Sequence, residues 1–258
     1  MVPAALGRAL RRPSLVVLVW ISALLGVDTV APRAGEWALG AATWVILIGL
    51  ARREAPLARV QIGVVVVFAT LVEYTFSAGL GVYTYRHHGV PAFVPPGHGL
   101  VYLGALDLGR QTWLRAHAMR ARIGVAVAVS LWALWGLTLS PTLDVLGAFW
   151  ALCLVVFLRW GRSPMTYVGA FVIVSWLEIL GTATGAWHWA PWSPTGLVAQ
   201  GNPPSGASGG YCWFDAAALW LGPVLLARWQ SRRADGDPCT AGPGSGPAVH
   251  GSPESVAV

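Results

Sequence analysis

Eight apolar segments follow one another along the chain, separated by short turns that hold most of its arginines. A helix that crosses a bilayer needs about 20 mostly apolar residues. The segments lie near residues 13–31, 36–51, 59–81, 96–114, 122–140, 143–159, 164–183 and 206–228. Only 11% of the residues are charged, whereas soluble domains carry about 25%. The sequence therefore predicts an all-α integral membrane protein with about eight transmembrane helices. Seven is the alternative, because Asp107 and Arg110 interrupt the fourth segment.

The arginines predict the orientation of these helices. Clusters precede the first segment, separate the second from the third, and follow the fourth, sixth and eighth, whereas the opposite loops hold only Arg33 and Arg86. By the positive-inside rule both termini are cytoplasmic. The net charge of +6 comes from arginines that lie in the turns between apolar segments. Membrane orientation therefore explains this charge, and we expect no nucleic-acid partner. The predicted location is the cell membrane, as a multi-pass protein of the bacterial inner membrane.

The two ends of the chain are predicted to lie outside the helical bundle. Residues 1–12 form a cytoplasmic N-terminus, and the first apolar segment resembles a signal peptide. We expect it to be retained, because Pro32 is poorly placed after a cleavage site at "TVA". Residues 231–258 are mostly Pro, Gly, Ser and Ala without an apolar period, which is typical of a disordered cytoplasmic tail.

An order of acidic, aromatic and proline residues occurs twice, which indicates an internal duplication. The first copy contains Glu73, Tyr83, Tyr85, Pro95, Pro96, Tyr102 and Asp107; the second contains Glu178, Trp187, Trp189, Pro203, Pro204, Tyr211 and Asp215. The duplication predicts two four-helix repeats, residues 13–118 and 122–230. Since each repeat has an even number of spans, the two would lie parallel, about an axis along the membrane normal.

The duplicated acids are the candidate catalytic residues. A charged carboxylate at the bilayer centre costs about 2.5–3.5 kcal/mol on insertion scales. Acids at these positions are therefore expected to have a function. We expect Glu73 and Glu178 in the outer half of the membrane and Asp107 and Asp215 near its middle. If the two repeats face each other, all four acids converge on one internal region. Hydrogen bonding between helices is the alternative for each acid. Asp107 is the weakest candidate, because Arg110 one turn later could pair with it.

Aromatic residues are predicted to surround these acids. Many of the 15 tryptophans suit a belt at the membrane interface, among them Trp20, Trp44, Trp113, Trp160 and Trp229. Trp176, Trp192 and the candidate substrate-binding residues are expected near the acids instead. These candidates are Trp187, Trp189, Tyr83, Tyr85, Tyr102, Tyr211, Trp213, His98 and Asn202. His98 is also expected to serve as a proton relay or as a hydrogen-bond partner of Glu73.

Acids among aromatic rings favour isoprenoid chemistry. Each aromatic face stabilises a cation by about 0.5–2 kcal/mol, so a protonated acid in a ring-lined cavity can protonate an alkene and hold the carbocation. The expected substrate is a lipophilic isoprenoid that reaches the site from the lipid bilayer. We expect no cofactor and no metal, and the oligomeric state stays open.

A family resemblance supports this interpretation. Glu178, Gly181, Thr184 and Gly185 form "ExxGxxTG", followed by an aromatic-x-aromatic pair, and this resembles the motif of the membrane carotenoid hydratases. Related membrane cyclases of lycopene and terpenoids likewise pair an intramembrane Glu with an Asp. The resemblance covers about a dozen residues in each copy, and the aromatic pair follows Gly185 sooner than in that family. It implies proton-initiated cyclisation or hydration of a polyene, with Glu178 and Glu73 as acids and Asp215 as a partner.

Two other functions fit the same residues. His87, His88, His98 and His188 lie near the two glutamates in the predicted topology, and with carboxylates they suggest a metal-dependent membrane enzyme. No H-x-x-x-H or H-x-x-H-H spacing occurs, however. Parallel repeats with buried carboxylates also suit a small ion-coupled transporter with a midplane site. A purely structural role is the third alternative.

Overall fold

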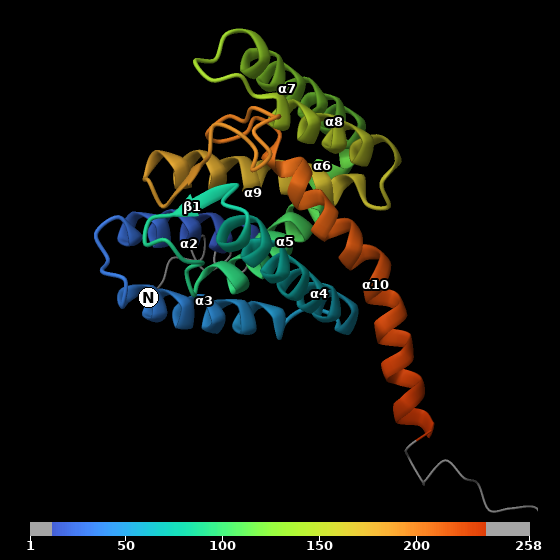
Figure 1. Cartoon of the computed structure of the whole chain (residues 1–258). Coiled ribbons are helices and arrows are strands. Elements are labelled where there is room, and N and C mark those ends of the chain that lie inside the picture. Colours follow the sequence, from blue (N-terminus) through green and yellow to red (C-terminus); the bar gives the residue numbers. More distant parts are fainter. Residues whose placement is uncertain (1–11, 236–258) are drawn as a thin grey trace, which may run out of the picture.

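The computed structural model describes residues 12–235 of the 258-residue chain. The expected N-terminal segment up to residue 11 and the tail from residue 236 lie outside the described residues (Figure 1). The regular secondary structure of the described part consists of α-helices, one π-helical turn and one pair of short strands. Its elements are α2 (Pro13–Asp28), α3 (Gly35–Ala51), α4 (Pro56–Glu73), η1 (Tyr74–Gly79), β1 (Tyr83–Tyr85), α5 (Val94–Arg110), α6 (Thr112–Ala116), α7 (Ala118–Thr138), α8 (Val145–Trp160), α9 (Pro164–Ala183), β2 (Trp187–Trp189) and α10 (Ala207–Asp235).

Proline sets the start of several of these helices. Pro13, Pro56 and Pro164 are the first residues of α2, α4 and α9, and Pro95 and Pro96 lie in the first turn of α5. Proline fits there because the first N–H groups of a helix have no partner in the helix and its φ is already helical. The Pro-Pro pair of the first motif therefore opens α5.

Among residues 12–235, four helices are long and apolar enough to cross a membrane. These are α4 together with η1, α7, α9 and α10 up to Arg233. The apolar helices α2, α3 and α8 are shorter, and α5 has 17 residues. All eight predicted segments coincide with helices of the described chain, and α10 extends beyond the other helices (Figure 1).

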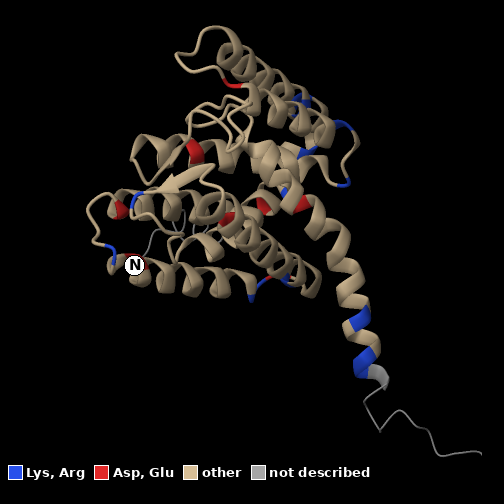
Figure 2. Ribbon diagram, viewed as in Figure 1, with Lys and Arg blue, Asp and Glu red and all other residues tan. Residues whose placement is uncertain are grey.

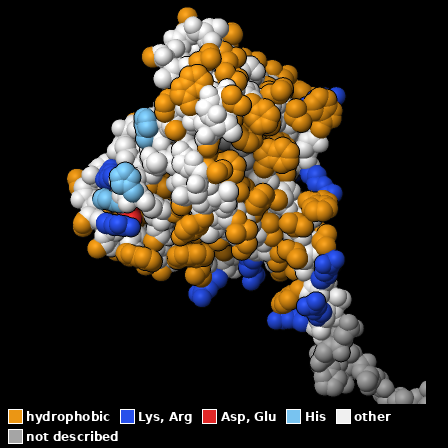
Figure 3. All heavy atoms as spheres, in the orientation of Figure 1, with side chains coloured by type: hydrophobic (Ala, Val, Ile, Leu, Met, Phe, Trp, Pro, Cys, Tyr) orange, Lys and Arg blue, Asp and Glu red, His pale blue; other side chains and the backbone are white. Residues whose placement is uncertain are grey.

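The outer surface has the character expected of helices in lipid. Large hydrophobic side chains face outward, such as Val45, Leu131 and Leu152, which are 71%, 61% and 62% exposed. Figure 2 shows arginines at helix ends and connecting turns, and Figure 3 shows hydrophobic atoms over much of the visible surface. Exposed apolar surface of this extent indicates contact with a membrane or a partner. The described chain is therefore all-α, and four of its helices are long and apolar enough to span a membrane.

Helix α5 forms the core of the bundle, with most of its residues buried. It packs against α9 through glycines. A Cβ at Gly109 would lie 2.8 Å from the Met165 carbonyl carbon, and one at Gly169 would overlap the Ala105 carbonyl oxygen. Small residues of this kind let helix backbones approach closely within membranes, and here they hold together helices from the two predicted repeats.

The two aromatic-x-aromatic motifs pair directly with each other. Strands β1 and β2 are antiparallel, with Tyr83 opposite Trp189 and Tyr85 opposite Trp187. The sequence predicted only irregular loops here, because three-residue strands carry too short an alternation to be recognised. The pairing brings the aromatic residues of the two motifs together above the ends of α4 and α9.

Candidate functional site

A cavity of about 370 Å³ lies below the strand pair, between α2, α4, α5, α9 and α10. Its wall is almost wholly apolar. Three acidic or basic side chains line it within the described residues: Glu73, His98 and Glu178. All three are nearly inaccessible to solvent, at 5%, 5% and 3% exposed.

Glu73 lies at the C-terminal end of α4 and accepts three hydrogen bonds. Its Oε2 accepts from the hydroxyls of Tyr83 at 2.9 Å and Tyr85 at 2.7 Å, and its Oε1 lies 2.8 Å from His98 Nε2. Burial raises the pKa of the Tyr83 and Tyr85 phenols, so both keep their protons and act as donors. The predicted contact between His98 and Glu73 is confirmed.

Glu178 lies in α9 and has an analogous set of donors from the second motif. Its Oε2 accepts from the indole N–H groups of Trp187 and Trp189, both at 3.1 Å, and Tyr211 Oη lies 3.4 Å from Oε1. Indole N–H can only donate. Glu178 Oε2 is therefore engaged by two fixed donors, whereas Oε1 has a single long contact.

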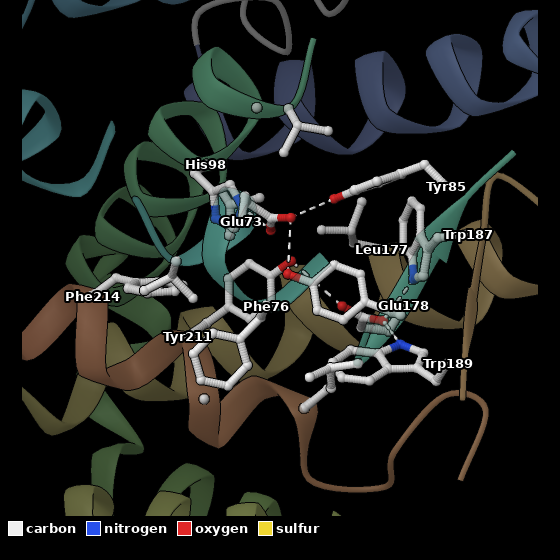
Figure 4. Close-up of a pocket in the computed structure, with 18 of the residues that line it drawn as sticks. Glu73, Phe76, Tyr85, His98, Leu177, Glu178, Trp187, Trp189, Tyr211 and Phe214 are labelled. Carbon is white, nitrogen blue, oxygen red and sulfur yellow. Dashed lines mark hydrogen bonds and ion pairs between the residues drawn. The ribbon is translucent and has the colours of Figure 1, made fainter. Parts of the chain in front are cut away.

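Ring contacts join these two acidic sites into one network. The Tyr83 ring lies 4.6 Å from the Trp189 ring, and the His98 ring stacks on Tyr211 at 5.1 Å. Each contact joins a partner of one glutamate to a partner of the other. Figure 4 shows both carboxyl groups directed into the space between these rings.

Glycines of the motif after Glu178 explain the local geometry. A Cβ at Gly181 would overlap the six-membered ring of Trp187, so only glycine lets that indole lie over α9 and reach the carboxylate. Gly185 has a φ of 70° and Gly81, in the first motif, a φ of 65°. This left-handed conformation favours glycine and turns the chain from helix to strand.

We expect the substitution Gly181→Ala to displace Trp187 from Glu178. Overpacking of this kind costs about 1–3 kcal/mol, so the free energy of unfolding should fall by that amount, together with any activity. Thermal unfolding of purified protein in detergent measures the effect. Gly63→Ala is a matched control, because a Cβ at Gly63 has no atom within 4 Å. An equal melting temperature for Gly181→Ala and Gly63→Ala would show that the Trp187 position is not fixed by this glycine.

The structure brings most, but not all, of the predicted site residues together. Tyr102 and Asn202 do not line the cavity. Tyr102 donates to Gln61 Oε1 at 3.0 Å within the core, and exposed Asn202 contacts the Trp189 N–H and His188. The predicted residues that line it are Glu73, Tyr83, Tyr85, His98, Glu178, Trp187, Trp189, Tyr211 and Trp213.

The four carboxylates do not converge as expected. Asp107 accepts the Ser14 N–H at 3.0 Å and so caps the start of α2. Its expected partner, Arg110, instead pairs with Glu54 at 2.7 Å. Asp107 lies three residues before the end of α5 at Arg110, whereas the predicted segment continues to residue 114.

Asp215 also lies outside the cavity wall, although it is close in sequence to a residue that lines it. It follows Tyr211 by one turn of α10 and is 3% exposed, and its Oδ2 has no hydrogen-bond partner among the described residues. The cavity therefore contains two of the four predicted carboxylates, Glu73 and Glu178.

The histidines separate in the structure. Only His98 lines the cavity, whereas His87, His88 and His188 lie outside it. Within residues 12–235, no group of three or more His, Cys, Asp or Glu side chains is arranged to hold a metal ion. The geometry therefore gives the histidine-based metal site no support.

Three tryptophans lie differently from the predictions, and one buried acid was missed. Trp20 was assigned to the interfacial belt but lines the cavity and donates to Thr43 Oγ1 at 3.2 Å. Trp176 and Trp192, expected near the acids, are 47% and 54% exposed and line no part of the cavity. Asp144, immediately before α8, is 2% exposed and accepts three backbone N–H groups. Its position before an apolar segment is a typical N-cap signal.

Comparison of the chain with protein-family models, with curated proteins and with solved structures found no match.

Proposed function

We propose that this protein is a membrane-embedded enzyme that protonates a polyene isoprenoid and so starts its cyclisation or hydration. One observation carries the proposal: two buried glutamates, each held by aromatic donors, line a single apolar cavity. The site would need no cofactor, since carboxyl and imidazole groups supply and recover the proton.

The proposal includes eight membrane spans with both termini in the cytoplasm of a bacterial cell. Helix α5, which contains His98, Asp107 and Arg110, has 17 residues and is about 25 Å long at 1.5 Å per residue. It is surrounded by other helices, so its polar residues need not face lipid. The arginine clusters then lie on one side of the membrane and the strand pair on the other.

The proposal also includes two four-helix repeats, residues 13–118 and 122–230. Glu73 precedes Tyr83 by ten residues, and Glu178 precedes Trp187 by nine. The π-helical turn Tyr74–Gly79 lies in the longer copy. A π-turn absorbs one extra residue in a helix and is common at functional sites. This accounts for the difference in spacing and supports a common origin of the two motifs.

The hydrogen bonds suggest which glutamate donates the proton. In Glu73 both carboxyl oxygens have close partners, whereas Glu178 Oε1 has only the contact of 3.4 Å with Tyr211. We assign the transferable proton to Glu178 Oε1. Glu73 and His98, 2.8 Å apart, form an acid–base pair that can accept a proton at the end of the reaction.

The proposed reaction conserves protons. The Glu178 proton forms a C–H bond with one alkene carbon, and the neighbouring carbon becomes a carbocation facing the aromatic rings. A second double bond, or water, attacks this cation. The Glu73–His98 pair then takes a proton from carbon or from the bound water, and the network returns it to Glu178. Aromatic faces stabilise the cation by about 0.5–2 kcal/mol each.

The cavity suits a substrate that arrives from lipid. Phe68, Phe76 and Trp213 line the cavity yet are 37%, 39% and 52% exposed on the outer surface of the bundle. An isoprenoid chain could therefore pass between η1 and α10 without crossing water. Because the substrate leaves lipid and not water, the hydrophobic effect adds little to its affinity, and close packing against the cavity wall must hold the hydrocarbon.

Expression in a bacterial host that makes linear polyene isoprenoids tests the proposal. The expected result is a new product of the same mass as the precursor, or one heavier by a water molecule, detected by chromatography with mass spectrometry. The comparison strain carries the empty vector. Unchanged isoprenoid profiles across several chain lengths, with the protein present in the membrane, would contradict the proposed reaction.

A further inference from the structure

A second cavity, of about 490 Å³, lies between α3 and the segment that follows β1. It shares no lining residue with the first cavity. Arg33, Glu36 and His87 line it together with aromatic side chains. Figure 3 shows basic, acidic and histidine side chains gathered in one group on this face, among hydrophobic atoms.

Glu36 is the buried anionic group of this cavity. It lies in the first turn of α3 and is 9% exposed, and no ion pair within residues 12–235 includes its carboxylate. The positive groups near it are His87, Arg33 and Arg86, and none of them lies within ion-pair distance. Its oxygens are not sealed within the protein, so an external group with N–H donors and a positive charge can reach them from the cavity.

The other half of the protein shows how such an acid is satisfied internally. Asp144 also lies at the start of an apolar helix, and it accepts the N–H groups of Gly147, Gly201 and Ser205 at 2.7–2.9 Å. The loop beside α3 approaches Gly40 closely, where a Cβ would lie 2.7 Å from Ala92 Cβ. None of its N–H groups bonds Glu36, and the second cavity occupies that space.

The rest of the cavity complements a phosphate group and the lipid interface. Arg33 is exposed, and its Nη2 would lie 3.8 Å from a Cβ at Gly89, on the opposite wall. Trp37, Trp44 and Tyr74 beside it are 75%, 40% and 56% exposed. Aromatic residues of this kind mark the level of lipid headgroups. A cation and an anion therefore face one small cavity, which the membrane topology proposed above places at headgroup depth.

We propose that this cavity binds the headgroup of a zwitterionic phospholipid with a primary amine, phosphatidylethanolamine. The ammonium group donates to Glu36, the phosphate accepts from Arg33, and the acyl chains lie along the exposed rings of Trp37 and Trp44. A choline headgroup offers no N–H donor to Glu36, and a glycerol headgroup offers no positive charge. The site therefore discriminates between lipids by their headgroup amine.

Native mass spectrometry of the full chain in detergent tests this site. Phosphatidylethanolamine, phosphatidylcholine and phosphatidylglycerol with identical acyl chains are titrated separately. We expect phosphatidylethanolamine to bind about tenfold more tightly than the other two, as one charge-assisted hydrogen bond supplies. Glu36→Gln should remove this preference, whereas Glu54→Gln, whose partner is Arg110, should keep it. The wild-type comparison of the three lipids needs no variant, so it stands even if Glu36→Gln fails to fold.

Three results would overturn the proposal. The first is equal binding of the three lipids, and the second is a preference for phosphatidylethanolamine that persists in Glu36→Gln. The third is equal affinity for soluble glycerophosphoethanolamine, which would mean that the ligand is a water-soluble zwitterion and not a membrane lipid. The inference does not depend on the reaction proposed for the first cavity.

Discussion

Glu178→Gln is expected to lower conversion of the isoprenoid by at least about 100-fold, the scale of general acid catalysis. The amide cannot release a proton to an alkene, although it still accepts from the indoles of Trp187 and Trp189. The fold should therefore persist. Product formation per unit of membrane protein, measured in the polyene-producing host, gives the effect. Elution as a single peak in detergent shows that the variant is folded.

The matched control for this experiment is Glu54→Gln. Glu54 forms an ion pair with Arg110 away from the cavity, and exposed pairs of this kind contribute about 0–1 kcal/mol. Its activity should equal that of the wild type. Full activity in Glu178→Gln would reject the proton assignment and leave Glu73 as the acid, and loss of activity in both variants would point to a general effect on the membrane protein.

Asp144→Ala is expected to cause the largest loss of stability, about 3–5 kcal/mol, because it leaves three buried N–H groups without an acceptor. These groups belong to Gly147, Gly201 and Ser205. They connect the start of α8 to the loop that leads into α10, and α10 carries Tyr211 to the cavity. Thermal unfolding in detergent should show a clear fall in melting temperature.

Asp144→Asn separates the hydrogen bonds from the volume of the side chain. Its amide oxygen can still accept, so we expect a smaller loss than for Asp144→Ala. If Asp144→Ala unfolded at the wild-type temperature, the loop would have to be held by other contacts, and the role assigned to this acid would be rejected.

The helices were predictable because long apolar segments separated by arginine-rich turns form a simple pattern in the sequence. These segments predicted the long helices to within about four residues, except that α10 continues to Asp235, beyond the predicted end at residue 228. Glu73 and Glu178 were identified because an acid within an apolar segment is costly and needs a reason. Their placement in one cavity agrees with the prediction for these two residues.

Whether the other predicted residues reach the cavity depends on how the helices pack against one another. Spacing along the chain does not reveal this packing. Tyr102 and Asp107 follow the first motif in sequence, yet α5 directs them to Gln61 and to the start of α2. By position in the helix, His98 corresponds to Tyr211, since each is the fifth residue of α5 or α10. The repeated motif matched the two Pro-Pro pairs and therefore Tyr102 with Tyr211. The helices are offset from this match because the loops before them differ in length.

The isotope content of the product tests the central claim most directly. If the two glutamates deliver a proton from exchangeable groups to an alkene carbon, isolated membranes given preformed precursor in heavy water should form a product with one deuterium bound to carbon. The deuterium should be absent from the unreacted precursor. A product that contains no carbon-bound deuterium would contradict proton-initiated chemistry in this cavity.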